Sequence, residues 1–154
     1  MAQEETGVEK EPLYKVKIII IDDDPLVLKT IREYLKDEFE VHVARGGEGA
    51  CSYLEKHPVN LILIDYEMPG EKGDSVLMNI RRIPLSAKTP AIFLTGAADP
   101  HTVAEILRSR PQGYLLKPVA REKLSEKIRA VLSGGGGESE SQPVNPSCSL
   151  EKTC

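Results

Sequence analysis

The stretch LILIDYEMPG, residues 61–70, decides the predicted fold. Four consecutive apolar residues lead into Asp65, a pattern typical of a strand that is buried on both faces of a parallel sheet. A second apolar run, residues 16–21, leads in the same way into three consecutive aspartates at residues 22–24. The two runs predict strands that bring their carboxylates to the same edge of the sheet.

Apolar runs alternate with amphipathic segments on both sides of this stretch. The alternation predicts an α/β fold, a doubly wound parallel sheet of five strands with helices on both faces. In the helix at 99–108, Val103, Ile106 and Leu107 are expected to share the buried side. Strands are predicted at 16–21, 39–44, 61–64, 91–94 and 114–116, and helices at 25–36, 47–56, 73–82, 99–108 and 120–132.

Composition and charge divide the chain into three predicted parts: a disordered tail at 1–14, one domain at 15–133 and a flexible Gly/Ser-rich tail at 134–154. The net charge is −4, but residues 16–133 hold 17 basic and 17 acidic residues, so the domain is neutral. Because nucleic-acid binding without sequence preference needs a basic face, we expect no nucleic-acid partner.

The location is predicted to be cytoplasmic. The acidic N-terminus lacks the apolar segment of a secretory signal, and the longest apolar run is too short to span a membrane. The three cysteines are an odd number without metal-ligand spacing, which fits free thiols in a reducing compartment. Cys51 is expected to be a small buried residue, and Cys148 and Cys154 lie in the predicted tail.

Polar residues follow four of the predicted strands: Asp22 with Asp23, then Asp65, Thr95 and Lys117. The carboxyl ends of parallel strands meet at one edge of a sheet, where such folds bind ligands. Clustered carboxylates repel one another, and oxygen ligands without His or Cys suit Mg²⁺. The simpler interpretation of the aspartates is a loop with a helix cap, which we assign to Asp24 alone.

Asp65 is the candidate nucleophile, because a carboxylate can form an acyl phosphate. Lys117 would pair with Asp65 and then with its phosphoryl group, and the Thr95 hydroxyl would donate to a phosphoryl oxygen. The alternatives are that Lys117 is a solvated surface lysine and that Thr95 caps its strand.

The motifs IDDDP (21–25), LIDYEMPG (63–70) with Gly73, LTG (94–96) and YLLKP (114–118) occur in this order. Over about residues 16–132 the chain thereby resembles the receiver domain of two-component response regulators. The resemblance implies a flavodoxin-like (CheY-like) sheet in order 2-1-3-4-5, with Asp65 as phosphoacceptor. It also implies a Mg²⁺ site of Asp22, Asp23, Asp65 and the Glu67 backbone carbonyl, and a cis bond before Pro118.

Similar proteins move an aromatic residue inward when the threonine approaches the phosphoryl group, so Thr95 and Tyr114 are the expected switch residues. Some positions depart from the commonest pattern. Pro111 is expected to shorten or re-aim the helix at 99–108. The sequence therefore does not determine the shape of the output surface there. Glu67 and Ala97 are expected to tune the lifetime of the acyl phosphate, in a direction that the sequence does not predict.

We therefore expect a stand-alone response regulator receiver rather than an enzyme, with only self-phosphorylation and slow self-dephosphorylation. A sensor histidine kinase or histidine phosphotransfer protein would donate the phosphoryl group, and an unknown downstream protein would bind the switched surface. A phosphorelay intermediate and a receiver fragment of a larger regulator remain open. So do a phosphatase that uses Asp65 and a degenerate receiver that only binds proteins.

Overall fold

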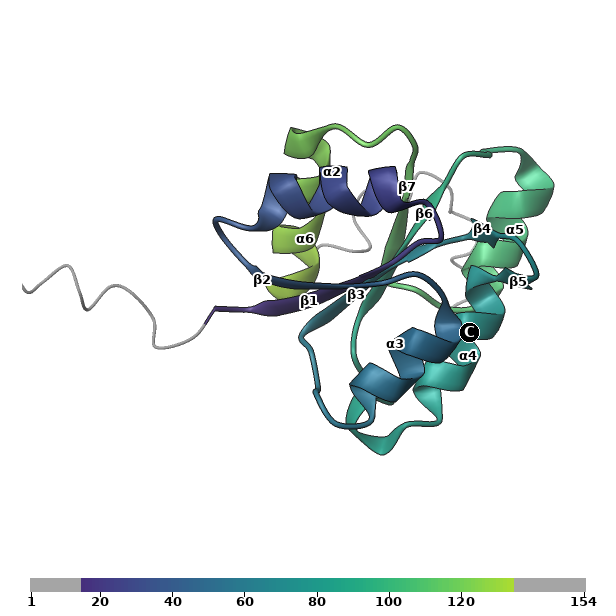
Figure 1. Ribbon diagram of the computed structural model, residues 1–154. Coiled ribbons are helices and arrows are strands. Elements are labelled where there is room, and N and C mark those ends of the chain that lie inside the picture. The colour runs from purple at the N-terminus through teal and green to yellow at the C-terminus, as the bar shows by residue number, and fades with distance from the viewer. Residues whose placement is uncertain (1–14, 135–154) are drawn as a thin grey trace, which may run out of the picture.

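The computed structural model describes residues 15–134 of the 154-residue chain. A parallel sheet of five strands runs through its middle in the order β2-β1-β3-β6-β7 (Figure 1). Counted along the chain, these strands have the predicted order 2-1-3-4-5, so the fold prediction is confirmed. The strands are β1 (Lys17–Ile21), β2 (Glu40–Ala44), β3 (Leu61–Asp65), β6 (Ala91–Thr95) and β7 (Gly113–Leu116).

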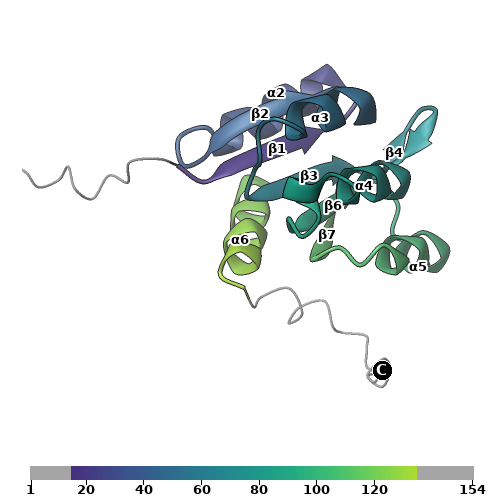
Figure 2. The ribbon, with the colours of Figure 1, turned by 90° about the horizontal axis from the view of Figure 1, so that it is seen from below.

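Helices cover both faces of the sheet. α2 and α6 lie on one face and α3 and α4 on the other, with α5 beside α4 at the far side of the molecule from β2 (Figures 1 and 2). The helices are α2 (Pro25–Leu35), α3 (Gly47–Leu54), α4 (Gly73–Arg81), α5 (Pro100–Arg108) and α6 (Arg121–Leu132), with the 3₁₀ turn η1 (Pro84–Ser86) after α4.

Two hydrophobic cores lie on the two sides of the sheet. In β1, Ile18 and Ile20 pack against α2 and α6, whereas Ile19 and Ile21 pack in the core below α3 and α4. Successive side chains of a strand point to opposite faces, so a strand covered on both faces must be apolar at every position. This is why the strands read as continuous apolar runs in the sequence.

Local signals set the starts of two helices. The Asp24 carboxylate accepts a hydrogen bond from Leu26 N at 2.9 Å, and Pro25 follows it at the first helical position. Asp99 caps α5 in the same way, accepting from Thr102 N at 3.0 Å. These caps satisfy backbone donors that have no partner inside the helix. They also confirm that Asp24 serves as a helix cap.

The structure differs from the sequence-based expectation in three places. A short hairpin of β4 (Glu67–Met68) and β5 (Glu71–Lys72) follows β3 and was not predicted. Leu107 was expected on the buried side of α5, but it is 50% exposed. Ile106 is the one residue of this helix that is fully buried. Cys51 is partly rather than fully buried. The predicted tails lie, apart from Gly134, outside the described residues.

Candidate phosphoryl and metal site

The parallel register brings the predicted site residues to one edge of the sheet. Ile21 is level with Ile64, Asp65 with Leu94, and Thr95 with Leu116. Residues that follow or end these strands therefore emerge side by side. The structure places Asp22, Asp65, Thr95 and Lys117 there, from four different segments.

Three carboxylates form a cluster at this edge. One oxygen each from Asp22, Asp23 and Asp65 lie within 4.8 Å of one another. Asp22 and Asp65 are almost fully buried, at 1% and 2% exposure, and Asp23 is partly buried. Backbone amides assist them, since Asp24 N donates to Asp22 Oδ1 at 2.9 Å and Glu67 N to Asp65 Oδ1 at 3.4 Å.

Lys117 joins the two buried carboxylates. Its Nζ lies 2.9 Å from Asp65 Oδ1 and 3.2 Å from Asp22 Oδ2. Burial by itself lowers the pKa of Lys117, but its hydrogen bond to Asp65 and the charges of both carboxylates raise the net pKa above its ordinary value. Lys117 is therefore a charged partner of Asp65 and not a solvated surface lysine. The peptide bond that follows it, to Pro118, is cis, as the resemblance implied.

The surroundings of the Asp65 carboxylate act on its charge in opposite directions. Burial raises its pKa to about 6; the Lys117 hydrogen bond opposes this rise and the Asp22 charge adds to it. At neutral pH the group is ionised, as a nucleophile must be. Its environment thus combines desolvation, a cation and a second anion within a few ångströms.

The donor set fits a hard divalent cation. Three carboxylates carry more negative charge than one lysine neutralises, and carboxylate oxygens are the ligands that Mg²⁺ prefers. Among the described residues, this is the group of acidic side chains that meets the geometry of a metal site. The residues that would hold the ion are Asp22, Asp23 and Asp65, together with the backbone carbonyl of Glu67 as the resemblance implies.

Thr95 reaches a partner that sequence reasoning missed. Its buried hydroxyl donates to Glu67 Oε2 at 2.6 Å, and the neighbouring Gly96 N–H donates to Glu67 Oε1 at 3.1 Å. The sequence indicated an acid near the site at Glu67 but not which donors its carboxylate holds. Thr95 is thus more than a strand-end cap, because its side chain ties β6 to the β4–β5 hairpin.

Tyr114 lies in β7, one strand beyond β6. It is partly buried and packs against the core beneath α3, α4 and α5. Tyr114 pairs with Phe93 of β6 in the sheet register, so it lies beside the strand that ends in Thr95. Its motion as a switch residue stays a prediction.

A second group, centred on Tyr66, was also missed. The Tyr66 side chain is 1% exposed and packs edge-on against Phe93, while its hydroxyl donates to Glu105 Oε1 of α5 at 2.9 Å. Lys72 Nζ, 3.2 Å from the same oxygen, and His101, 3.1 Å from the other oxygen, complete the contacts of Glu105. Burial and the nearby carboxylates raise the pKa of Tyr66, so its hydroxyl stays a donor.

Comparison with known proteins agrees with this geometry. The family model described as the response regulator receiver domain matches residues 18–129. The chain belongs to this family. Its fold is close to that of the Vibrio cholerae chemotaxis protein CheY4, with a TM-score of 0.72 and 25% identity, over 76% of this chain and 98% of that one. A CheY-like receiver protein from Methanospirillum hungatei gives 0.69 and 26%, over 77% and 94%.

Curated relatives carry the same region inside longer proteins. The receiver is 34% identical to the transcriptional regulatory protein DegU of Brevibacillus brevis, over 79% of this chain and 52% of that protein. It is 28% identical to the histidine-protein kinase BarA of Escherichia coli, over 94% and 17%. The chain spans about half or less of the curated relatives compared. Within residues 15–134, no helix has the length and hydropathy that crossing a bilayer requires.

Proposed function

We propose that this receiver accepts a phosphoryl group on Asp65 from a phosphohistidine of a sensor histidine kinase or histidine phosphotransfer protein. The observation that carries the proposal is the position of Lys117, which contacts both Asp65 and Asp22 beside the third carboxylate, Asp23. Such a constellation has the parts that phosphoryl transfer needs: a nucleophile, a cation and a metal-binding acid pair.

The proposed transfer is a simple displacement. An Asp65 oxygen attacks phosphorus, the P–N bond of the phosphohistidine breaks, and the imidazole leaves with the electron pair. Lys117 then turns from the carboxylate to an oxygen of the new phosphoryl group, and the Thr95 hydroxyl donates to another oxygen. A Mg²⁺ ion, when bound by Asp22, Asp23, Asp65 and the Glu67 carbonyl, supplies positive charge that offsets the phosphoryl oxygens.

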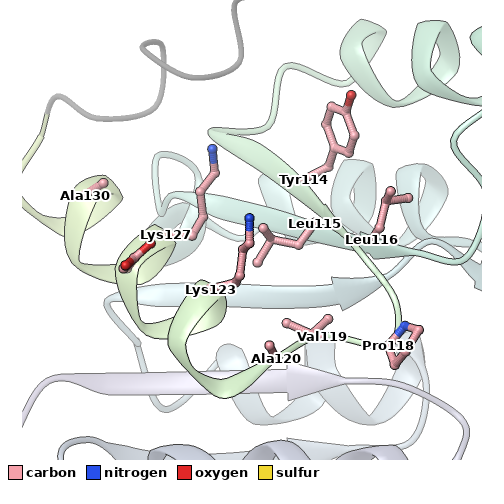
Figure 3. A pocket seen from close by; sticks show the side chains of 10 residues that line it. Tyr114, Leu115, Leu116, Pro118, Val119, Ala120, Lys123, Lys127 and Ala130 are labelled. Atoms are coloured by element: carbon pink, nitrogen blue, oxygen red, sulfur yellow. The ribbon is translucent and has the colours of Figure 1, made fainter.

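The proposed output is a protein contact on the surface between β7 and α6. A groove of about 760 Å³ lies there, with Tyr114 and Leu116 coming from β7 and Lys123 and Lys127 from α6 (Figure 3). Apolar side chains share this surface with two lysines and with Glu126, a mixture that suits a protein partner. Tyr114 borders it, so a movement of Tyr114 would change its shape.

We further propose that the chain is a stoichiometric phosphoryl acceptor without turnover of a separate substrate, apart from slow loss of its own phosphoryl group. A phosphorelay intermediate, which returns the phosphoryl group to a histidine phosphotransfer domain, is the second candidate. The sensor kinases among the curated relatives, BarA and TmoS of Ectopseudomonas mendocina, support keeping it. Labelled phosphate that moves reversibly between purified partners would favour the relay.

The test uses small phosphodonors in the presence of Mg²⁺. Acetyl phosphate, and phosphoramidate as a donor with a P–N bond, should label the purified chain at one phosphoryl group per molecule by mass spectrometry. Asp65→Ala should abolish labelling and Asp23→Asn should weaken Mg²⁺ binding. Asp24→Ala is the matched control, because it removes a neighbouring carboxylate that caps α2 and leaves the cluster intact. Labelling that persists in Asp65→Ala would show that the site assignment is wrong.

A further inference from the structure

The two donors at the end of β6 are already held by one carboxylate. Thr95 Oγ1 donates to Glu67 Oε2 at 2.6 Å and Gly96 N donates to Glu67 Oε1 at 3.1 Å, so both oxygens of Glu67 are engaged. The first distance is typical of a hydroxyl bonded to a charged oxygen. A phosphoryl oxygen on Asp65 would accept hydrogen bonds from donors of this kind.

Both partners of this contact are fixed by their own elements. Thr95 is fully buried at the end of β6. Glu67 begins the β4–β5 hairpin, whose base is closed where Gly73 N donates to Tyr66 O at 2.9 Å. The Glu67 side chain therefore approaches Thr95 from a restrained backbone, and the contact is a built feature of the fold.

A hydroxyl carries a single proton, which it can donate to one acceptor at a time. Two acceptors lie within reach of the Thr95 hydroxyl, Glu67 Oε2 at 2.6 Å and the neutral Ala97 O at 3.1 Å, and the charged, closer one is favoured. While Thr95 donates to Glu67, it cannot donate to a phosphoryl oxygen. On phosphorylation, the Thr95 hydroxyl must leave the Glu67 carboxylate and donate to a phosphoryl oxygen instead. The free energy that the phosphorylated state gains from Thr95 is therefore only the difference between these two charge-assisted hydrogen bonds.

We propose that the Glu67 carboxylate is an internal competitor of the phosphoryl group for the donors of Thr95 and Gly96. Glu67 thereby acts as a positioning residue that holds Thr95 in the unphosphorylated arrangement and raises the threshold for switching. This role belongs to the carboxylate and is separate from that of the Glu67 backbone carbonyl. The inference rests on the proposed function of Asp65 as phosphoacceptor.

Beryllofluoride, a mimic of the phosphoryl group, tests the competition at equilibrium. Its affinity is measured at saturating Mg²⁺ for the wild type, Glu67→Ala, Thr95→Val and the double variant. In the presence of Thr95, Glu67→Ala should tighten binding about tenfold, because the fraction of molecules with Thr95 available rises. In the Thr95→Val background most of this gain should vanish, since valine keeps the shape but offers no hydroxyl.

Two controls separate the contact from a simple loss of charge. Glu71→Ala removes a carboxylate from the same hairpin, but one that accepts from Gly47 N, so it should leave beryllofluoride affinity within about twofold. Glu67→Gln keeps an acceptor oxygen without the charge and should give an intermediate gain. In ¹⁵N-labelled protein, the Gly96 amide resonance should move in Glu67→Ala and stay in place in Glu71→Ala.

The outcomes are distinguishable. If Glu67→Ala tightens binding equally with and without the Thr95 hydroxyl, charge repulsion alone explains the gain and the proposal is overturned. An unmoved Gly96 resonance would overturn it too. A wild-type chain that does not bind beryllofluoride, or an Asp65→Ala chain that still does, would refute the proposed function itself, and with it the competition.

Discussion

The helices α5 and α6, which precede and follow β7 in the chain, are attached to the molecule in different ways. α6 buries four residues: Leu124, Lys127, Ile128 and Val131. α5 buries one, Ile106, and adds a polar attachment in which Glu105 accepts from Tyr66 and Lys72. Buried apolar area contributes about 25 cal/mol per Å², whereas one hydrogen bond contributes about 1 kcal/mol net, because in the unfolded chain water takes its place.

This difference indicates which of the two helices can move at the lower cost in free energy. Displacing α6 would expose four buried residues of its own and part of a hydrophobic core. Displacing α5 would expose one fully buried residue of its own, Ile106, with the partly buried Val103, and would break the contacts of Glu105. α5 also follows β6 closely in the chain, so the proposed movement of Thr95 would be transmitted to it through a short connection. The unequal attachment makes α5 the element best suited to respond at the site.

Truncating the core of α6 gives the largest expected effect. Leu124→Ala should lower the free energy of unfolding by about 3 kcal/mol, because it removes a fully buried side chain and leaves a cavity. The matched variant in α5, Leu107→Ala, removes a leucine that is 50% exposed and should cost less than about 0.5 kcal/mol. Urea melts of both variants check the comparison, and equal costs would break it.

The next effect concerns the packing of α6 on β7. A Cβ added at Gly113 would collide with the Lys127 side chain, which is buried against it. Gly113→Ala should therefore cost about 1.5 kcal/mol, at the lower end of overpacking, because the colliding atoms are the far end of a flexible lysine that can shift but must leave its buried place. In the Lys127→Ala background, Gly113→Ala should lower the free energy of unfolding by less than it does in the wild type. Urea melts of the wild type, the two single variants and the double variant measure this coupling. Additive costs would show that the two residues do not crowd each other.

A smaller effect is expected from the polar attachment of α5. Tyr66→Phe should cost about 1 kcal/mol, because it removes the hydroxyl that reaches Glu105 and leaves the ring packed on Phe93. Hydrogen exchange should quicken in α5 more than in α6. Tyr34→Phe, a matched change in α2 on the other face of the sheet, serves as control and should leave exchange in α5 unchanged. Faster exchange spread evenly over both helices would contradict a local role.

The smallest effect is a change in titration. The hydrogen bond from Tyr66, and after it that from Lys72, hold the pKa of Glu105 below its ordinary value. A depressed carboxyl pKa means that the attachment is present above the unfolded-state pKa and is lost as the pH falls through the folded-state pKa. Tyr66→Phe and Lys72→Ala should each raise the pKa of Glu105, as followed by side-chain ¹³C NMR. An unchanged pKa in Tyr66→Phe would contradict the attachment through the tyrosine hydroxyl.

Much of the site was predictable because its residues sit directly behind strands. Asp22, Asp65 and Lys117 follow or end continuous apolar runs, and parallel strands deliver their carboxyl ends to one edge. Leu107 was misplaced for a related reason. The helical period shows that Val103, Ile106 and Leu107 share a side, but not that α5 contacts the core along a stripe only one residue wide.

The sequence by itself determined the order of strands and helices, the family and the set of groups at the sheet edge, because apolar periodicity and strand-end residues are local signals. Only the tertiary structure decided which donors the Glu67 carboxylate holds and how α5 is attached. Glu67 and Thr95 are 28 residues apart and Tyr66 and Glu105 are 39 apart. Such contacts depend on the path of an unpredicted hairpin and the placement of a helix, which no local pattern encodes.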